Sequence, residues 1–176
     1  MPHSSVIGVF AVSLAFLCTI EFFKMRTPKN DLRRVEFKFT NQLPKIDVKV
    51  KSPEHCIQIF RDIWEDPLFD LQEQVHALFL DFSDNLLCWR RLGAGSYKSC
   101  IVDTRLLLRI ALDCNSFKVV IAHNHPCGTA EPSIADEHLT ERVMLSCAAA
   151  DIELLDHLIL TRAGFYSFRM SDNILV

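Results

Sequence analysis

Two histidines, His123 and His125, stand one residue apart at the end of a short apolar run, VVIAHNH. On an extended segment, residues two apart point to the same side, so two imidazole nitrogens can reach one ion. Asp136 follows eleven residues later and offers a carboxylate. Two histidines and one carboxylate leave an open position on tetrahedral zinc, which is typical of a catalytic rather than a structural site. Zinc lowers the pKa of water in that position to about 7.

Ser133 and Asp136 form a second pattern, Ser-x-x-acid, which by itself predicts the capped N-terminus of a helix. The cap and the metal site need not compete, because a helix N-terminus beside a metal directs its free N–H groups toward developing negative charge. Other histidines are expected to be ordinary surface or core residues: His3, His55, His76 and His138. We also expect His157, in LLDHLIL, to be a structural residue of a strand beside Asp156, with a supporting role behind the metal ligands as the alternative.

Two similar motifs are excluded. Zinc deaminases combine His-x-Glu with Pro-Cys-x-x-Cys. Here His125 stands where the glutamate would be, and Ala130 stands where the second cysteine would be. The letters HNH also match the name of a nuclease group, but its name-giving residues are spread along a longer motif.

The elements that must position these residues follow from helix caps and apolar patterns. Helices are predicted after the N-caps Ser52, Asp103 and Ser133. On the third helix, Ile134 is expected to share the apolar side with Leu139, Val143 and Cys147. Strands are predicted over residues 73–82, 86–92, 117–122, 152–161 and 165–170.

This order of elements, with hairpins at both ends, predicts an α/β fold in which helices flank a mixed β-sheet. Sites in such folds lie at the carboxyl ends of strands, beside helix N-termini. The segment from Val119 to Asp136 contains one such crossing point.

Composition indicates one domain with a real core, because the chain has 176 residues and 49% of them are apolar. The seven cysteines are odd in number and include no Cys-x-x-Cys pair, which argues against a disulfide framework. A reducing, cytoplasmic location is therefore expected.

The first 51 residues differ from the remainder and are expected to lie outside the core, which we place at residues 52–176. Residues 6–23 are mostly apolar with one charged residue, Glu21, so they are a marginal membrane anchor that would leave the following domain in the cytoplasm. Alternatively, translation starts at Met25; a secretory signal is the third interpretation. Residues 24–51 hold nine Lys/Arg and three Asp/Glu, so this basic arm could bind DNA or an anionic membrane, although a solvated linker is the simpler interpretation.

The composite motif His123-x-His125, seven residues, Ser133-x-x-Asp136 closely resembles the signature of JAMM (MPN+/JAB) metalloproteases. The longer context, QEQVHALFLD, VVIAHNHPCG, EPSIAD and LLDHLIL, is similar to the JAB domain of the RadC-like family from about residue 71 onward. The resemblance implies a cytidine-deaminase-like JAB/MPN fold and one zinc ion per chain. It places the metal ligands on His123, His125 and Asp136.

The same resemblance matches Glu73 to the family's general acid/base and Ser133 to the serine that orients water or the oxyanion. It implies a zinc-dependent hydrolase that cleaves a peptide or isopeptide bond. Cys127 stands where the family commonly has serine, and it is expected to lie outside the ligand set. The alternative is a non-catalytic DNA-repair or mobile-element accessory module that binds DNA or a protein partner. The basic arm favours that alternative slightly, whereas the intact motif favours the enzyme.

Overall fold

The computed structural model describes residues 21–23, 34–36, 48–64 and 67–171. Contacts divide the chain into two compact units, Met1–Pro44 and Lys45–Val176. In the first unit, β1 (Glu21–Phe23) and β2 (Arg34–Glu36) pair in antiparallel fashion. The rest of the apolar run at residues 6–23, and most of the basic arm, lie outside the described residues. Within the described part of the chain, no helix has the length and apolar character needed to cross a membrane.

The second unit is built around a five-stranded sheet of order β4-β3-β5-β6-β7. Its strands are β3 (Gln74–Leu80), β4 (Leu86–Ala94), β5 (Lys118–Asn124), β6 (Glu153–Leu160) and β7 (Phe165–Ser167). Only the pair β5–β6 is parallel, and the helix between these strands makes the crossover that a parallel pair requires. The structure therefore confirms the predicted α/β fold with a mixed sheet.

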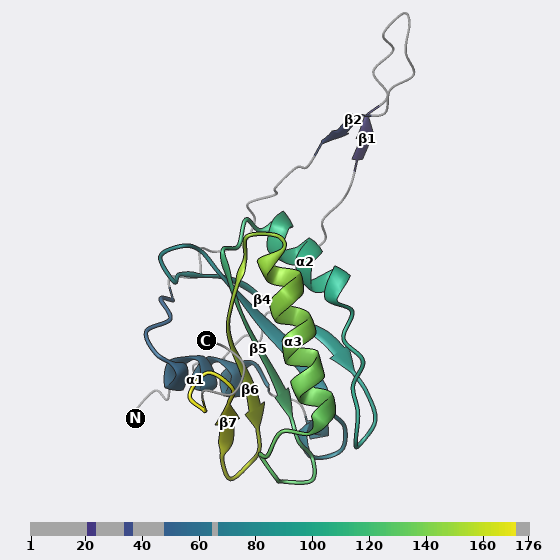
Figure 1. Ribbon diagram of the computed structural model, residues 1–176, viewed down its shortest axis with the longest axis vertical. Coiled ribbons are helices and arrows are strands. Elements are labelled where there is room, and N and C mark those ends of the chain that lie inside the picture. Colours follow the sequence, from purple (N-terminus) through teal and green to yellow (C-terminus); the bar gives the residue numbers. More distant parts are fainter. Residues whose placement is uncertain (1–20, 24–33, 37–47, 65–66, 172–176) are drawn as a thin grey trace, which may run out of the picture. The chain divides into compact units, whose positions relative to one another are not determined.

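Helices cover both faces of this sheet. The helices α2 (Thr104–Asp113) and α3 (Ile134–Ala148) cover one face (Figure 1). The other face is covered by α1 (Pro53–Ile63). Side chains of β5 alternate between the two layers, because Val119 and Ile121 join the α2–α3 side whereas Val120 and Ala122 join the α1 side. A strand that is buried on both faces is held in place by both layers, and β5 carries His123 and leads directly into His125.

Each of the three predicted N-caps is present. Ser52, Asp103 and Ser133 accept backbone N–H groups of the helices that follow them. One expectation about α3 was wrong, since Leu139, Val143 and Cys147 are buried but Ile134 is 72% exposed. Ile134 is the first residue of the helix, so its side chain lies beyond the layer that covers the others.

Each of the five strands differs from expectation at one or both limits. The final strand ends at Ser167 rather than at residue 170, because the chain turns there and the N–H of Arg169 donates to the carboxylate of Asp156. At the other end, Lys49 forms a β-bridge with Asn85. The chain thus contacts the sheet a few residues before residue 52, and the division of the chain at that residue stays a prediction.

Candidate metal centre

The three predicted ligands lie together where β5 ends and α3 begins. His123 lies near the end of β5, His125 follows it, and Asp136 lies in the first turn of α3. The Nε2 atoms of the histidines are 2.9 Å apart. Asp136 brings Oδ1 to 3.1 Å from Nε2 of His123 and Oδ2 to 3.4 Å from Nε2 of His125. Ligand atoms of a tetrahedral zinc ion lie about 3.4 Å apart, so this triangle has nearly the size that such an ion requires.

A tight turn after His125 fixes the orientation of its ring. The N–H of Gly128 donates to the carbonyl of His125, with Pro126 as the second residue of the turn. Gly128 has a φ of 83°, a conformation that favours glycine. The turn brings the carbonyl of Thr129 to 2.8 Å from Nδ1 of His125. Because a carbonyl can only accept, Nδ1 carries the proton and Nε2 presents a lone pair to the site.

Three buried groups orient the ring of His123. Its Nδ1 lies 2.8 Å from Nε2 of His157, and Nδ1 of His157 lies 2.6 Å from the hydroxyl of Thr140. That hydroxyl donates its only proton to the carbonyl of Asp136, at 2.7 Å. Thr140 must therefore accept from His157, which in turn accepts from Nδ1 of His123. The Nε2 atom of His123 is left with a lone pair facing the site.

These proton positions make the centre fit a cation. Two imidazole lone pairs and a carboxylate converge, and two lone pairs 2.9 Å apart cannot satisfy each other. Burial raises the pKa of Asp136, but the contacts with His123 and His125 outweigh burial and hold it well below its usual range. Burial holds the pKa of His157 well below its usual value, which keeps that ring neutral. The donor set is therefore suited to holding a divalent metal ion.

The side chain of Ser133 is hydrogen-bonded to the carboxylate of Asp136. The two residues form a capping box, in which the N–H of Asp136 donates to the Ser133 hydroxyl and the N–H of Ser133 donates to Oδ2 of Asp136. The hydroxyl of Ser133 also lies 2.6 Å from the same Oδ2 atom. Ser133 thus holds one oxygen of the ligand in place and leaves Oδ1 facing His123.

Glu73 lies immediately before β3 and is half-buried. Two backbone hydrogen bonds hold it, from its N–H to Ser96 and from Gly95 to its carbonyl. Burial raises the pKa of its carboxyl above the ordinary 4.5, and the charges on His125 and Asp136 act on it in opposite directions. The carboxyl is therefore within electrostatic range of two of the three ligands without belonging to the ligand cluster.

Asn124, between the two histidines, points away from them and is fully buried. Its amide donates to the carbonyls of Phe69 and Gln72, and its oxygen accepts the N–H of Gln74. It thereby ties the segment that carries Glu73 to β5. Sequence reasoning missed this role, as it missed Thr140, because neither residue belongs to a spacing pattern.

None of the six cysteines in the described part of the chain belongs to the ligand cluster. Cys127, two residues after His125, is exposed and is not among the grouped ligand atoms. The six cysteines among the described residues carry free thiols, and Cys18 lies outside that part of the chain.

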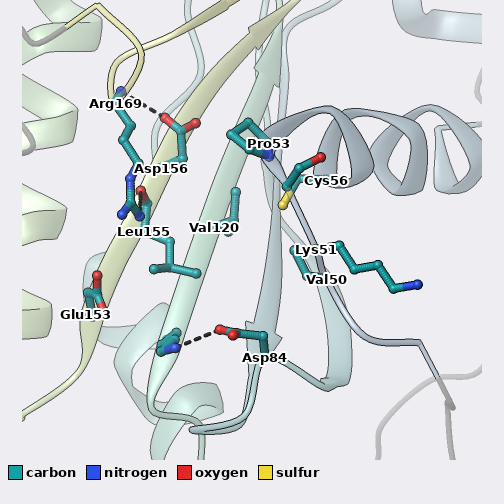
Figure 2. Close-up of a pocket in the computed structure, with 12 residues that line it drawn as sticks. Val50, Lys51, Pro53, Cys56, Asp84, Val120, Glu153, Leu155, Asp156 and Arg169 are labelled. Atoms are coloured by element: carbon teal, nitrogen blue, oxygen red, sulfur yellow. Dashed lines mark hydrogen bonds and ion pairs between the residues drawn. The ribbon is translucent and has the colours of Figure 1, made fainter.

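A cavity of about 400 Å³ lies at the opposite end of β5, between the start of α1 and the sheet (Figure 2). Three of its charged side chains, those of Lys118, Asp84 and Asp156, form ion pairs or hydrogen bonds. Lys118 and Asp84 form an ion pair of 2.6 Å, and the buried Asp156 accepts from Ser167 and from the N–H of Arg169. No histidine among the described residues lines this cavity.

The mixed sheet between two helical layers, with the histidine pair and Asp136 at the end of its parallel strands, defines a domain of the JAB/MPN type. The chain matches the family described as RadC-like JAB domain over residues 50–173, and it belongs to that family. It is also 32% identical over 125 residues to a UPF0758 protein of Aquifex aeolicus (strain VF5). That match covers 71% of this chain and 52% of the relative, so the chain spans about half the length of the curated relative it matches.

Proposed function

We propose that this chain is a zinc-dependent hydrolase that cleaves a peptide or isopeptide bond. The observation that supports the proposal most directly is the convergence of two imidazole lone pairs and one carboxylate. Three protein ligands are the number found in catalytic zinc sites, which keep one position open. A zinc ion held by these residues would supply Lewis acidity and would lower the pKa of a bound water to about 7.

In the proposed reaction, the residues of the chain perform the proton transfers and the positioning. Glu73 accepts a proton from the attacking water and later returns it to the leaving amine. Its raised pKa favours the first step, because a more basic carboxylate accepts a proton more readily. Ser133 holds the carboxylate of Asp136, and the first turn of α3 directs N–H groups toward negative charge on the substrate.

The test measures metal content and hydrolysis on the same preparations of the full chain. Purified protein is stripped of metal, reloaded with zinc and incubated with a mixture of proteome-derived peptides and isopeptide-linked chains. New amino termini are detected by mass spectrometry. We expect about one zinc per chain and zinc-dependent cleavage, both of which His123→Ala and Asp136→Ala should abolish. His138→Ala is the matched control, because His138 is exposed on the same helix.

A chain that binds one zinc but cleaves none of these substrates would contradict the hydrolase. A chain that binds no zinc at all would contradict the metal centre as well.

A second candidate function is DNA binding through the basic arm, and it is favoured by the excess of six positive charges over residues 24–51. Binding of this kind weakens steeply with salt, because it depends on counterion release. A chain that begins at Lys45 lacks six of the nine basic residues of the arm. If the arm binds DNA, the full chain should show salt-dependent affinity that this shorter chain loses, and equal affinities would rule out the arm.

A further inference from the structure

His157 was expected to be an ordinary strand residue, yet it is completely buried beside a metal ligand. On the parallel pair of strands, His157 of β6 is the register partner of Ile121. Its ring lies 4.8 Å from the ring of His123, measured between centroids, and stacks on Phe168 at 4.9 Å with an interplanar angle of 8°. The stacking fixes the plane of the ring, so its two nitrogens point in set directions.

Both nitrogens of His157 have partners in the metal centre. Nε2 contacts His123, and Nδ1 contacts Thr140, whose hydroxyl donates to the backbone carbonyl of Asp136. A buried histidine that served only to fill space could be replaced by an apolar ring, which avoids the cost of desolvating polar atoms. This ring is instead the middle member of a chain of three hydrogen bonds that joins one metal ligand to the backbone of another.

The direction of these hydrogen bonds has a chemical consequence for His123. A neutral imidazole has one proton, so it presents a lone pair on Nε2 only while the proton stays on Nδ1. The chain of hydrogen bonds from Asp136 through Thr140 and His157 places an acceptor, Nε2 of His157, opposite Nδ1 of His123. The proton of His123 is therefore held on Nδ1. The partner of the second nitrogen commonly fixes the tautomer and the ring orientation of a metal-binding histidine.

We propose that His157 is a positioning residue that, supported by Thr140, keeps the proton of His123 on Nδ1 and so prepares Nε2 to bind metal. This inference rests on the proposed metal centre and adds two residues that neither carry ligand atoms nor touch a substrate. Thr140 sets the direction, because its hydroxyl can accept from His157 only while its own proton is donated to Asp136. Without that hydroxyl, His157 would carry its proton on Nε2 and donate it to His123. The proton of His123 would then move to the metal-facing nitrogen.

The experiment compares Thr140→Val with Thr140→Ser in the full chain, with His157→Phe as a third variant. Valine has the shape of threonine without the hydroxyl, serine keeps the hydroxyl, and phenylalanine keeps a ring that can stack on Phe168. Zinc affinity is measured by competition with a chelator. We expect Thr140→Val and His157→Phe to bind zinc about 10- to 100-fold more weakly. Thr140→Ser should stay within about twofold of the native chain.

A second readout separates positioning from a general loss of stability. The ring nitrogens of His123 are observed by ¹⁵N NMR in the metal-free chain, where protonated and unprotonated nitrogens have distinct shifts. We expect the native chain and Thr140→Ser to carry the proton on Nδ1, and Thr140→Val to carry a substantial share on Nε2. A residue that served packing alone would lower the thermal midpoint and leave both the tautomer and the zinc affinity unchanged.

Native zinc affinity in Thr140→Val, together with a proton that stays on Nδ1, would overturn the inference. If His157→Phe fails to fold, the comparison of the two Thr140 variants decides the question. If the native chain binds no zinc, the proposed function fails, and the tautomer in the metal-free chain still decides this inference.

Discussion

Val75 on β3 and His123 on β5 are partners in the antiparallel register of the sheet. Glu73 comes two residues before Val75, and His125 comes two residues after His123, so alternation places all four side chains on one face at one end of the sheet. The pairing of two strands thus brings the carboxyl of Glu73 toward His125, which lies 52 residues away in the sequence.

Replacing Glu73 should separate chemistry from metal binding. Glu73→Gln keeps the shape of the side chain but cannot accept a proton, so zinc content should stay near one per chain while turnover falls about 100- to 10,000-fold. The control is Glu141→Gln, an exposed position on α3. Metal content and hydrolysis are measured on the same samples. If Glu73→Gln turns over substrate at the native rate, Glu73 does not act as the proton acceptor.

Replacing Ser133 should weaken both the helix and the ligand that the helix carries. Ser133→Ala removes the N-cap of α3 and the hydrogen bond to Oδ2 of Asp136, which should cost about 1 kcal/mol of unfolding free energy in the metal-free chain. Ser133→Thr keeps the oxygen and should lose less. Chemical denaturation measures both variants. Equal stability of the alanine variant and the native chain would show that the cap contributes nothing.

Replacing Cys127 should leave the metal centre unchanged. The thiol is exposed and lies outside the ligand cluster, so Cys127→Ser should keep about one zinc per chain, with an affinity near that of the native protein. His125→Ala, two residues earlier, serves as the positive control for metal loss. A large fall in zinc content on Cys127→Ser would mean that a thiolate replaces one of the assigned ligands.

Shortening the chain from its N-terminus tests where the core begins. Val50 is buried in the cluster under α1, and the segment from Val48 to Val50 makes two backbone hydrogen bonds with the β3–β4 hairpin. A chain that starts at Ser52 should still fold and bind zinc, but it should be less stable than one that starts at Lys45 by about 2 kcal/mol. Thermal and chemical unfolding of the two chains measure the difference. Equal stabilities would place the boundary at residue 52 or later.

Alkylation of the folded chain should distinguish the cysteines by burial. Burial raises the pKa of Cys56 to about 12 and that of Cys147 to about 11, so at pH 8 both thiols are almost entirely protonated. Because the thiolate is the reactive form, Cys127 should be labelled by iodoacetamide before either of them. Mass spectrometry of peptides follows each site, and denaturant should remove the difference. Rapid labelling of Cys56 without denaturant would show that α1 opens readily.

The sequence predicted the features that depend on neighbouring residues. The caps Ser52, Asp103 and Ser133 are recognisable because a cap acts on N–H groups two or three residues away. The spacing of His123 and His125 indicated a shared direction for the same reason. Glu73 was placed by resemblance, and the strand register explains how it reaches the site.

Other features depend on contacts that spacing does not reveal. The role of His157 requires the register of a parallel pair, the rotation of α3 and the direction of one hydroxyl proton at Thr140. The three hydrogen bonds of Asn124 require the return of β3 alongside β5. A lone histidine or asparagine in a strand gives no periodic signal. Its spacing therefore indicates a structural residue and does not reveal the contacts that it makes.

The amide of Asn124 has a mechanical consequence for the whole centre. Its three hydrogen bonds connect the backbone around the start of β3 to the end of β5, between the two histidines. The backbone on either side of Glu73 is therefore tied directly to the segment between His123 and His125. If Glu73 transfers protons as proposed, this hydrogen-bonded connection holds its backbone in place beside the candidate metal centre.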